Sequence, residues 1–177
     1  MTAAGVAVVG LNGCGKTTLG RALARELGAF RMDVEDYFFP PSDAVPFTVS
    51  RTKDEARRLL LADMDKHPRF VLSLVNGDWC EGLPTRLRCA VFLSAPKEVR
   101  LARIEDRERL RFGDRVLPGG DMYEQQWAFR AYVAGRTEAP IDRWLKSAGL
   151  PVLRLDTCRS IEDNTARASA FCRALGL

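Results

Sequence analysis

The segment Gly10-Leu11-Asn12-Gly13-Cys14-Gly15-Lys16-Thr17 constrains the fold of this chain more than any other feature of its sequence. It matches the pattern G-x-x-x-x-G-K-[ST] and lies between the apolar run Gly5–Val9 and the helical pattern of residues 15–27. Glycines let consecutive N–H groups curl around phosphate oxygens, and the N-terminus of the following helix adds a positive dipole end. This strand–loop–helix context therefore predicts a binding site for a nucleoside triphosphate.

The residue types inside the loop predict separate roles. Lys16 supplies a cation for the β- and γ-phosphates, and the Thr17 hydroxyl is a ligand for Mg²⁺. Cys14 contributes mainly its backbone. The predicted nucleotide-binding residues of the loop are Gly10, Leu11, Asn12, Gly13, Cys14, Gly15, Lys16, Thr17 and Thr18.

Short apolar runs alternate with helical patterns along the whole chain. The predicted strands are Gly5–Val9, Ala29–Asp33, Phe70–Val75, Ala90–Leu93 and Pro151–Leu155. Nearly unbroken apolar runs are typical of strands covered on both faces, as in a parallel sheet. We therefore predict an α/β fold: a three-layer α/β/α sandwich around a five-stranded parallel sheet, formed by residues 1–177 as one domain.

Helix boundaries are indicated by caps, prolines and glycines. Capping boxes at Thr52–Glu55 and Asp121–Glu124 predict two helix starts, and Ala56, Leu59, Leu60 and Met64 are expected to face inward on the first of these helices. Further helices are predicted from Pro96 to about Arg109, between Pro140 and Gly149, and from Ser160 to Leu175.

Composition excludes several classes of function. A formal charge of +4 without a basic tail favours small anionic ligands over nucleic acid. No apolar stretch approaches the ~20 residues of a membrane span, and no signal peptide is recognisable, so we expect a cytoplasmic protein.

The five cysteines form no CxxC pair and suit reduced thiols, and His67, the only histidine, argues against a His-based triad or zinc site. Neither the guanine signature Asn-Lys-x-Asp nor an hhhhDE motif is present, which argues against a GTPase switch and an AAA or ABC motor.

With this loop, the short second strand ending in Asp33 and the arginine-rich stretch after the fourth strand, the chain resembles the superfamily of nucleoside monophosphate kinases and shikimate kinases. It is most similar to adenylate-kinase-like bacterial P-loop ATPases. The resemblance implies that Asp33 holds Mg²⁺ or orients the acceptor hydroxyl, where Glu35 and Asp36 are alternatives. It also implies that Arg103 stacks on adenine and Arg107 contacts phosphates.

The arginine stretch permits two interpretations. Arg100, Arg103, Arg107 and Arg111 recur at spacings of three and four and share one helical face, which favours an anion site. The alternative is a solvated helix neutralised by neighbouring acids, namely Glu98, Glu105, Asp106 and Glu108.

The resemblance assigns further parts of the chain. Thr157 and Arg159 follow the fifth strand, where the family has its adenine-binding loop. Residues 107–135 correspond to a lid that would carry Arg115 over the phosphates and exclude water. The same lid segment also reads as a plain surface loop.

The acceptor side departs from the family. The Asp-Gly-Phe-Pro-Arg stretch of adenylate kinases and the Gly-Gly-Gly triplet of shikimate kinases are absent. Asn76 and Asp78 are the candidate acceptor ligands after the third strand, together with Asp33 and, in the acceptor-side segment 34–69, Arg51. Trp79 either stacks on a bound ring or belongs to the core.

The sequence thus predicts an ATP-dependent phosphotransferase that moves the γ-phosphate of Mg·ATP to a small acceptor, with Lys16, Asp33, Arg107 and Arg115 as catalytic residues. The acceptor could be a nucleotide, a nucleoside or a hydroxylated metabolite. The alternative is a regulatory or assembly P-loop ATPase with slow hydrolysis. Sequence alone leaves the acceptor and the oligomeric state open.

Overall fold

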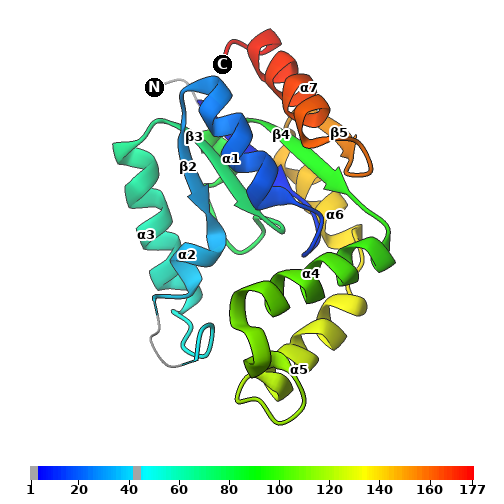
Figure 1. The fold of residues 1–177 in the computed structure, drawn as a ribbon. Coiled ribbons are helices and arrows are strands. Elements are labelled where there is room, and N and C mark those ends of the chain that lie inside the picture. The colour runs from blue at the N-terminus through cyan, green and yellow to red at the C-terminus, as the bar shows by residue number, and fades with distance from the viewer. Residues whose placement is uncertain (1–3, 42–44) are drawn as a thin grey trace.

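A five-stranded sheet, all parallel, forms the centre of the protein in the computed structural model, which describes residues 4–41 and 45–177 (Figure 1). The strand order is β2-β3-β1-β4-β5, so β1, which leads into the P-loop, is central. The strands are β1 Ala4–Val9, β2 Phe30–Asp33, β3 Arg69–Leu74, β4 Leu87–Ser94 and β5 Val152–Asp156.

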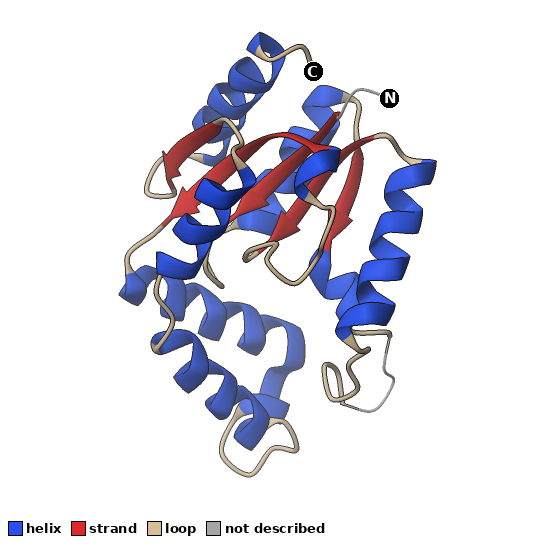
Figure 2. Ribbon diagram, turned by 180° about the vertical axis from the view of Figure 1, so that it is seen from behind, coloured by secondary structure: helices blue, strands red, loops and turns tan. Residues whose placement is uncertain are grey.

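Helices cover both faces of this sheet. Buried side chains of α1 and α7 pack on one face, and those of α3 and α6 pack on the other, which confirms the predicted three layers. Figure 2 shows α4 and α5 as a pair that extends beyond the sheet. The helices are α1 Lys16–Leu27, α2 Val34–Phe38, α3 Lys53–Lys66, α4 Lys97–Phe112, α5 Tyr123–Ala134, α6 Ala139–Ala148 and α7 Ile161–Ala174, with 3₁₀ turns η1 Pro84–Arg86 and η2 Gly113–Val116.

Strand β1 explains why its sequence is apolar without alternation. Ala7 and Val9 belong to the core on the α3–α6 face, whereas Val6 and Val8 belong to the core on the α1–α7 face. Because a strand directs successive side chains to opposite faces, a strand covered on both sides needs apolar residues at every position. The same reason applies to β3 and β4.

Most predicted helix starts agree with the structure, and one is wrong. The Thr52 hydroxyl accepts the Glu55 N–H in a complete capping box, as predicted. Asp121, however, does not cap α5, which begins at Tyr123, because its carboxylate accepts hydrogen bonds from the Arg115 guanidinium instead.

Three other details differ from the sequence expectation. Helix α4 continues to Phe112 rather than to Arg109, and the acidic stretch after Asp33 forms the short helix α2. Leu59 was expected to face inward but is 38% exposed, since the core of α3 is formed by residues on its neighbouring face. His67 ends α3 as its C-cap and stacks on Phe30.

Within residues 4–41 and 45–177, no helix combines the length and the apolar character needed to cross a membrane. The cytoplasmic location stays a prediction.

Adjacent leucines of α3 provide a test of this packing. Leu60 is fully buried whereas Leu59 is exposed, so Leu60→Ala should lower the free energy of unfolding by about 2–5 kcal/mol. Leu59→Ala should lower it by less than about 1 kcal/mol, because little apolar area is lost from the core. Urea denaturation of both variants measures the difference, and equal losses would contradict this position of α3.

Candidate active site

The P-loop connects β1 to α1 at the edge of the sheet where the parallel strands end. Gly13 and Gly15 have φ angles of +81° and +95°, a region that side-chain-bearing residues rarely adopt. Gly15 is also the N-cap of α1 and offers no side chain to the first N–H groups of the helix. These amides therefore border the loop as donors for an anion, which is the predicted phosphate cradle.

The loop is held from outside by α4. A Cβ atom added to Gly13 would lie 2.4 Å from the carbonyl oxygen of Arg100, so only glycine permits this approach. The buried Arg100 donates to the Asn12 carbonyl at 3.2 Å, and Arg136, after α5, donates to the Asn12 side chain at 3.3 Å. The start of α4 and the end of α5 thus fix the position of the P-loop.

Lys16, Thr17 and Asp33 converge at the mouth of the loop. The Lys16 ammonium donates to the Leu11 carbonyl at 3.1 Å and so lies over the loop. The Thr17 hydroxyl donates to Asp33 Oδ2 at 2.8 Å, while Asp33 Oδ1 accepts the Glu35 N–H at 3.2 Å. Asp33 is buried at the end of β2, and Arg31 lies 3.6 Å from its carboxylate.

This donor set fits Mg²⁺. A hydroxyl and a carboxylate side by side are hard oxygen ligands, and Mg²⁺ usually takes one or two carboxylates together with phosphate oxygens and waters. Among the residues that the structure describes, no cluster of three or more acidic, cysteine or histidine side chains offers a competing metal site. Thr17 and Asp33 would hold the ion, as the sequence predicts.

A cavity of about 640 Å³ opens above these residues, and we name it the P-loop cavity. Three arginines of α4, Arg103, Arg107 and Arg111, line it opposite Lys16, together with Glu35 of α2. Its lining residues are Asn12, Gly13, Gly15, Lys16, Thr17, Thr18, Arg21, Arg31, Asp33, Val34, Glu35, Asp36, Val75, Arg103, Ile104, Arg107 and Arg111.

Two arginines of α4, Arg107 and Arg111, have no close ion pair with the acids of their own helix among the described residues. Within residues 4–41 and 45–177, neither Arg107 nor Arg111 forms an ion pair, and the buried acid of this helix, Glu108, pairs with Arg130 of α5 at 3.1 Å. Like charges that share a face without close acidic partners favour binding of an anion. The anion-site interpretation of this helical face stays a prediction, which this arrangement favours.

Of the residues predicted to bind adenine, the structure brings Arg103 and Thr157 together but not Arg159. Arg103 donates to the hydroxyl and the carbonyl oxygen of Thr157, at 3.1 Å each, which ties α4 to the turn after β5. Arg159 instead pairs with Asp163 one turn along α7, at 3.4 Å. Thr157 is thus joined to the lining of the P-loop cavity through Arg103, whereas the Arg159 guanidinium contacts Asp163 and does not line this cavity.

Two other predicted site residues lie outside the P-loop cavity. Arg115, in η2, forms a bidentate pair with Asp121, with contacts of 2.9 and 2.7 Å. Arg51 donates to the carbonyl oxygens of Asp36 and Tyr37 and thereby ties the segment before α3 to α2. Their predicted catalytic and acceptor-binding roles stay predictions.

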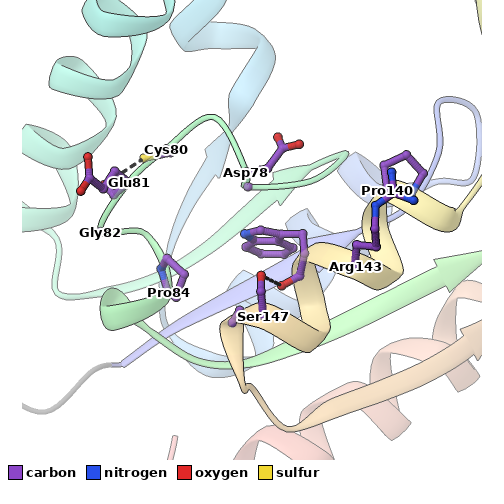
Figure 3. A pocket seen from close by; sticks show the side chains of 11 residues that line it. Asp78, Cys80, Glu81, Gly82, Pro84, Pro140, Arg143 and Ser147 are labelled. Atoms are coloured by element: carbon purple, nitrogen blue, oxygen red, sulfur yellow. Dashed lines mark hydrogen bonds between the residues drawn. The ribbon is translucent and has the colours of Figure 1, made fainter.

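The loop after β3 lies against α6. Asp78 borders a hollow of about 560 Å³ that Arg143 and Ser147 of α6 also line (Figure 3). Asn76 contacts Asp78 at 3.4 Å, and its carbonyl accepts the indole N–H of Trp79. Trp79 packs against the core, which favours the core interpretation of this residue, and the loop places Asn76 and Asp78 outside the lining of the P-loop cavity.

A second cavity, of about 220 Å³, adjoins the first and is named here the aromatic cavity. Glu35, Arg107 and Arg111 line both cavities, so they form the boundary between them. The aromatic cavity is lined by Glu35, Phe39, Phe47, Arg107, Glu108, Arg111, Phe112, Gln125, Gln126 and Phe129.

Two carboxyl groups of this cavity have perturbed acidity. Burial raises the pKa of Glu35, and the neighbouring Asp33 carboxylate raises it further, while Arg107 and Lys16 act in the opposite direction. Glu35 as a whole residue is exposed, but protein atoms surround its carboxyl on most sides. Burial likewise raises the pKa of Glu108, against the opposing charge of Arg130.

Sequence reasoning missed most of the aromatic cavity. The available signal was helical spacing: Glu108 and Phe112 are four residues apart on α4, and Gln125 and Phe129 are four apart on α5. Each pair therefore shares a helical face, but the sequence does not show that the two faces meet. No motif in the sequence indicated that Arg136 contacts the P-loop or that Arg31 lies beside Asp33.

Comparisons with known proteins give the family and the fold of this chain. A family model described as an AAA domain, AAA_18, matches residues 6–115. The chain is also 32% identical over 168 residues to the uncharacterized protein YqaC of Bacillus subtilis (strain 168), covering 90% of this chain and 92% of the relative. Strand β3 of this chain ends without the acidic pair of an AAA motor, so the match gives family membership and not that motif.

Solved kinase structures share the fold across nearly the whole chain. A sugar kinase from Janibacter sp. HTCC2649 superposes with a TM-score of 0.60 at 18% identity, with 98% of each chain covered. Shikimate kinase from Acinetobacter baumannii in complex with shikimate gives 0.55 at 20%, covering 99% of this chain and 96% of that chain. Deoxyadenosine kinase from M. mycoides with bound dATP gives 0.59 at 13%, covering 96% and 99%. At these identities the likeness establishes the fold.

The close approach of Gly13 to α4 predicts the effect of a single methyl group. Gly13→Ala places a Cβ against the Arg100 backbone, in a φ region unfavourable for alanine, so the loop must shift. We expect the affinity for Mg·ATP, measured by calorimetry, to fall by about tenfold or more, equivalent to at least about 1.4 kcal/mol.

Gly28→Ala is the matched control. Gly28 also has a positive φ, of +58°, but open space surrounds its Cβ position at the end of α1. This variant should lose about 1 kcal/mol of stability through backbone strain while binding Mg·ATP as the parent does. Equal affinities for the two variants would contradict the packing of the loop on α4.

Proposed function

Since the chain belongs to the AAA_18 family, described as an AAA domain, and has the fold of P-loop small-molecule kinases, we propose that it transfers the γ-phosphate of Mg·ATP to the hydroxyl of a small acceptor. One observation carries the proposal. The P-loop cavity combines Lys16, the Thr17–Asp33 pair and arginines that form no close ion pair among the described residues, and it adjoins a second, smaller cavity.

The donor side binds and orients the triphosphate. The N–H groups of the P-loop and the first turn of α1 hold the phosphate oxygens, and Lys16 moves from its contact with Leu11 to the β- and γ-phosphates. Mg²⁺, when bound by Thr17 and Asp33, would neutralise charge on the phosphate oxygens.

Arginines of α4 stabilise the charge of the transferring group. In phosphoryl transfer the negative charge spreads over the equatorial oxygens, so catalysis rests on positioned cations. Arg107 faces both cavities and is the residue best placed to contact the γ-phosphate. Arg103 is restrained by Thr157 and suits the nucleoside end of the donor.

Glu35 is the acid that orients the acceptor in this proposal. Both oxygens of Asp33 already have partners, and Asp78 lies in another hollow, whereas Glu35 lies at the boundary of the two cavities. Its carboxylate accepts the hydrogen bond of the acceptor hydroxyl and receives its proton. The hydroxyl oxygen then bonds to the γ-phosphorus, the bond to the β–γ bridging oxygen breaks, and the electron pair leaves with ADP.

Residues 107–135 act as the lid of this kinase in our proposal. They include the end of α4, η2 and α5, which extend beyond the sheet (Figure 1). A lid over both cavities would exclude water, which otherwise competes with the acceptor for the γ-phosphate.

The direct test is an assay with Mg·ATP and a panel of nucleosides, nucleotides, sugars and hydroxy acids. We expect a phosphorylated product and ADP in equal amounts with at least one acceptor, and Lys16→Met should abolish transfer because the phosphates lose their cation. Tight ATP binding with slow hydrolysis and no transfer to any acceptor would instead favour a regulatory or assembly ATPase.

A matched pair of arginines tests the transition-state role. Arg107→Ala should lower kcat by roughly 100-fold or more, because a cation next to the transferring phosphoryl group is lost. Arg109→Ala is the control, since Arg109 is exposed on the same helix but lines neither of the two cavities. Steady-state kinetics of the two variants should differ in kcat, and equal kcat values would remove Arg107 from the mechanism.

A further inference from the structure

The aromatic cavity has a lining that suits a flat ring rather than a flexible polar chain. Phe39 and Phe47 meet edge to face, with ring centroids 5.4 Å apart, and Phe112 and Phe129 complete the apolar lining. The Arg111 guanidinium lies over the rings of Phe47 and Phe112, at 5.3 and 5.2 Å from their centroids. Rings arranged in this way offer stacking surfaces to a planar ligand.

The backbone that brings Phe47 to the cavity is strained. Among the described residues, Phe47 is the only non-glycine residue with a positive φ, at +66°. Gln125 of α5 donates to the Pro46 carbonyl at 3.1 Å and holds this segment in place. A bulky residue in such a conformation costs free energy, and such residues cluster at ligand clamps.

Two oxygens at the cavity have no hydrogen-bond partner among the described residues. One is Oε1 of Glu108, a side chain that is 2% exposed and whose other oxygen is held by Arg130. The other is the side-chain oxygen of Gln125. Buried acceptors without donors are costly, so a ligand whose N–H groups meet these oxygens after a small rotation of the two side chains would remove that cost.

From these three features we infer that the aromatic cavity binds the planar, N–H-bearing base of a nucleoside, and that a hydroxyl of its sugar is the phosphoryl acceptor. The inference rests on the proposed function and specifies its acceptor class. Rings hold the base, and Glu108 and Gln125 accept its N–H groups.

The boundary between the cavities sets the orientation of this acceptor. Glu35 and Arg107 line both cavities, so a base in the aromatic cavity directs its sugar toward the P-loop cavity. The Glu35 carboxylate at this boundary can accept a hydrogen bond from a hydroxyl, whereas the phosphate of a nucleoside monophosphate would compete with the donor triphosphate for Arg107 and Arg111. A polyol or hydroxy acid would leave the rings without a stacking partner.

Calorimetry and a transfer assay on the full chain test this inference with adenosine, guanosine, cytidine and thymidine. Their 5′-monophosphates, together with shikimate and gluconate, are the comparison ligands. We expect at least one nucleoside to bind and to be phosphorylated with a kcat/KM at least tenfold above that of its monophosphate and of both aliphatic acids.

Phe129→Leu and Trp127→Leu are the matched variants, since both residues are aromatic and on α5 but only Phe129 lines the cavity, whereas Trp127 is 57% exposed. Loss of base stacking in Phe129→Leu should raise the KM for the nucleoside by roughly 5- to 150-fold. Binding of Mg·ATP and the melting temperature of Trp127→Leu should match the parent, and Phe129→Leu should retain Mg·ATP binding.

The outcomes distinguish a failure of the proposed kinase activity from a failure of the inferred nucleoside acceptor. Failure to bind Mg·ATP would overturn the proposed function. Transfer to an aliphatic hydroxy acid alone, absence of nucleoside binding, or a nucleoside KM unchanged in Phe129→Leu would overturn the inference and leave the proposed kinase activity standing. Transfer to the phosphate of a monophosphate alone would overturn both the inference and the hydroxyl acceptor of the proposed function.

Discussion

The contact between Gly13 and the backbone of Arg100 is the constraint on which the site depends. A methyl group does not fit between them, so the P-loop and the start of α4 are in van der Waals contact along their main chains. Arg100 adds a hydrogen bond to Asn12, and a buried guanidinium needs such partners. The phosphate cradle and α4 therefore behave as one unit, which fixes where every later residue of this helix can lie.

Helix α4 serves both cavities because its period places different residues on neighbouring faces. Arg103 and Arg107 continue the face that begins at Arg100 and line the P-loop cavity. Glu108 and Phe112 lie on the adjacent face and line the aromatic cavity against α5. A rotation of this helix would disturb the charged side and the apolar side together, so one rigid element couples the linings of the two cavities.

The positions of three acids depend on how the chain continues after β2 and β3. Asp33, at the end of β2, accepts a hydrogen bond from Thr17 although β3 lies between β2 and β1, and α2, which follows directly, brings Glu35 to the boundary of the two cavities. The loop after β3 turns toward α6 and packs on Trp144, so Asp78 borders a different hollow. Asp33, Glu35 and Asp78, which all follow strands in the sequence, thus lie in three different places in the molecule.

Local signals in the sequence determined the P-loop, the strands, the parallel sheet and the arginine face, since each depends on residues close together in the chain and on covering both faces of a strand. They did not determine that Asp121 pairs with Arg115, that Arg136 reaches Asn12, or that Phe47 and Phe129 share a cavity. These contacts join segments whose approach depends on how α4 and α5 pack, and a helical pattern gives the face of each helix without giving its partner. The sequence therefore determined the P-loop between its strand and helix, and only the tertiary structure decided what lies beside it.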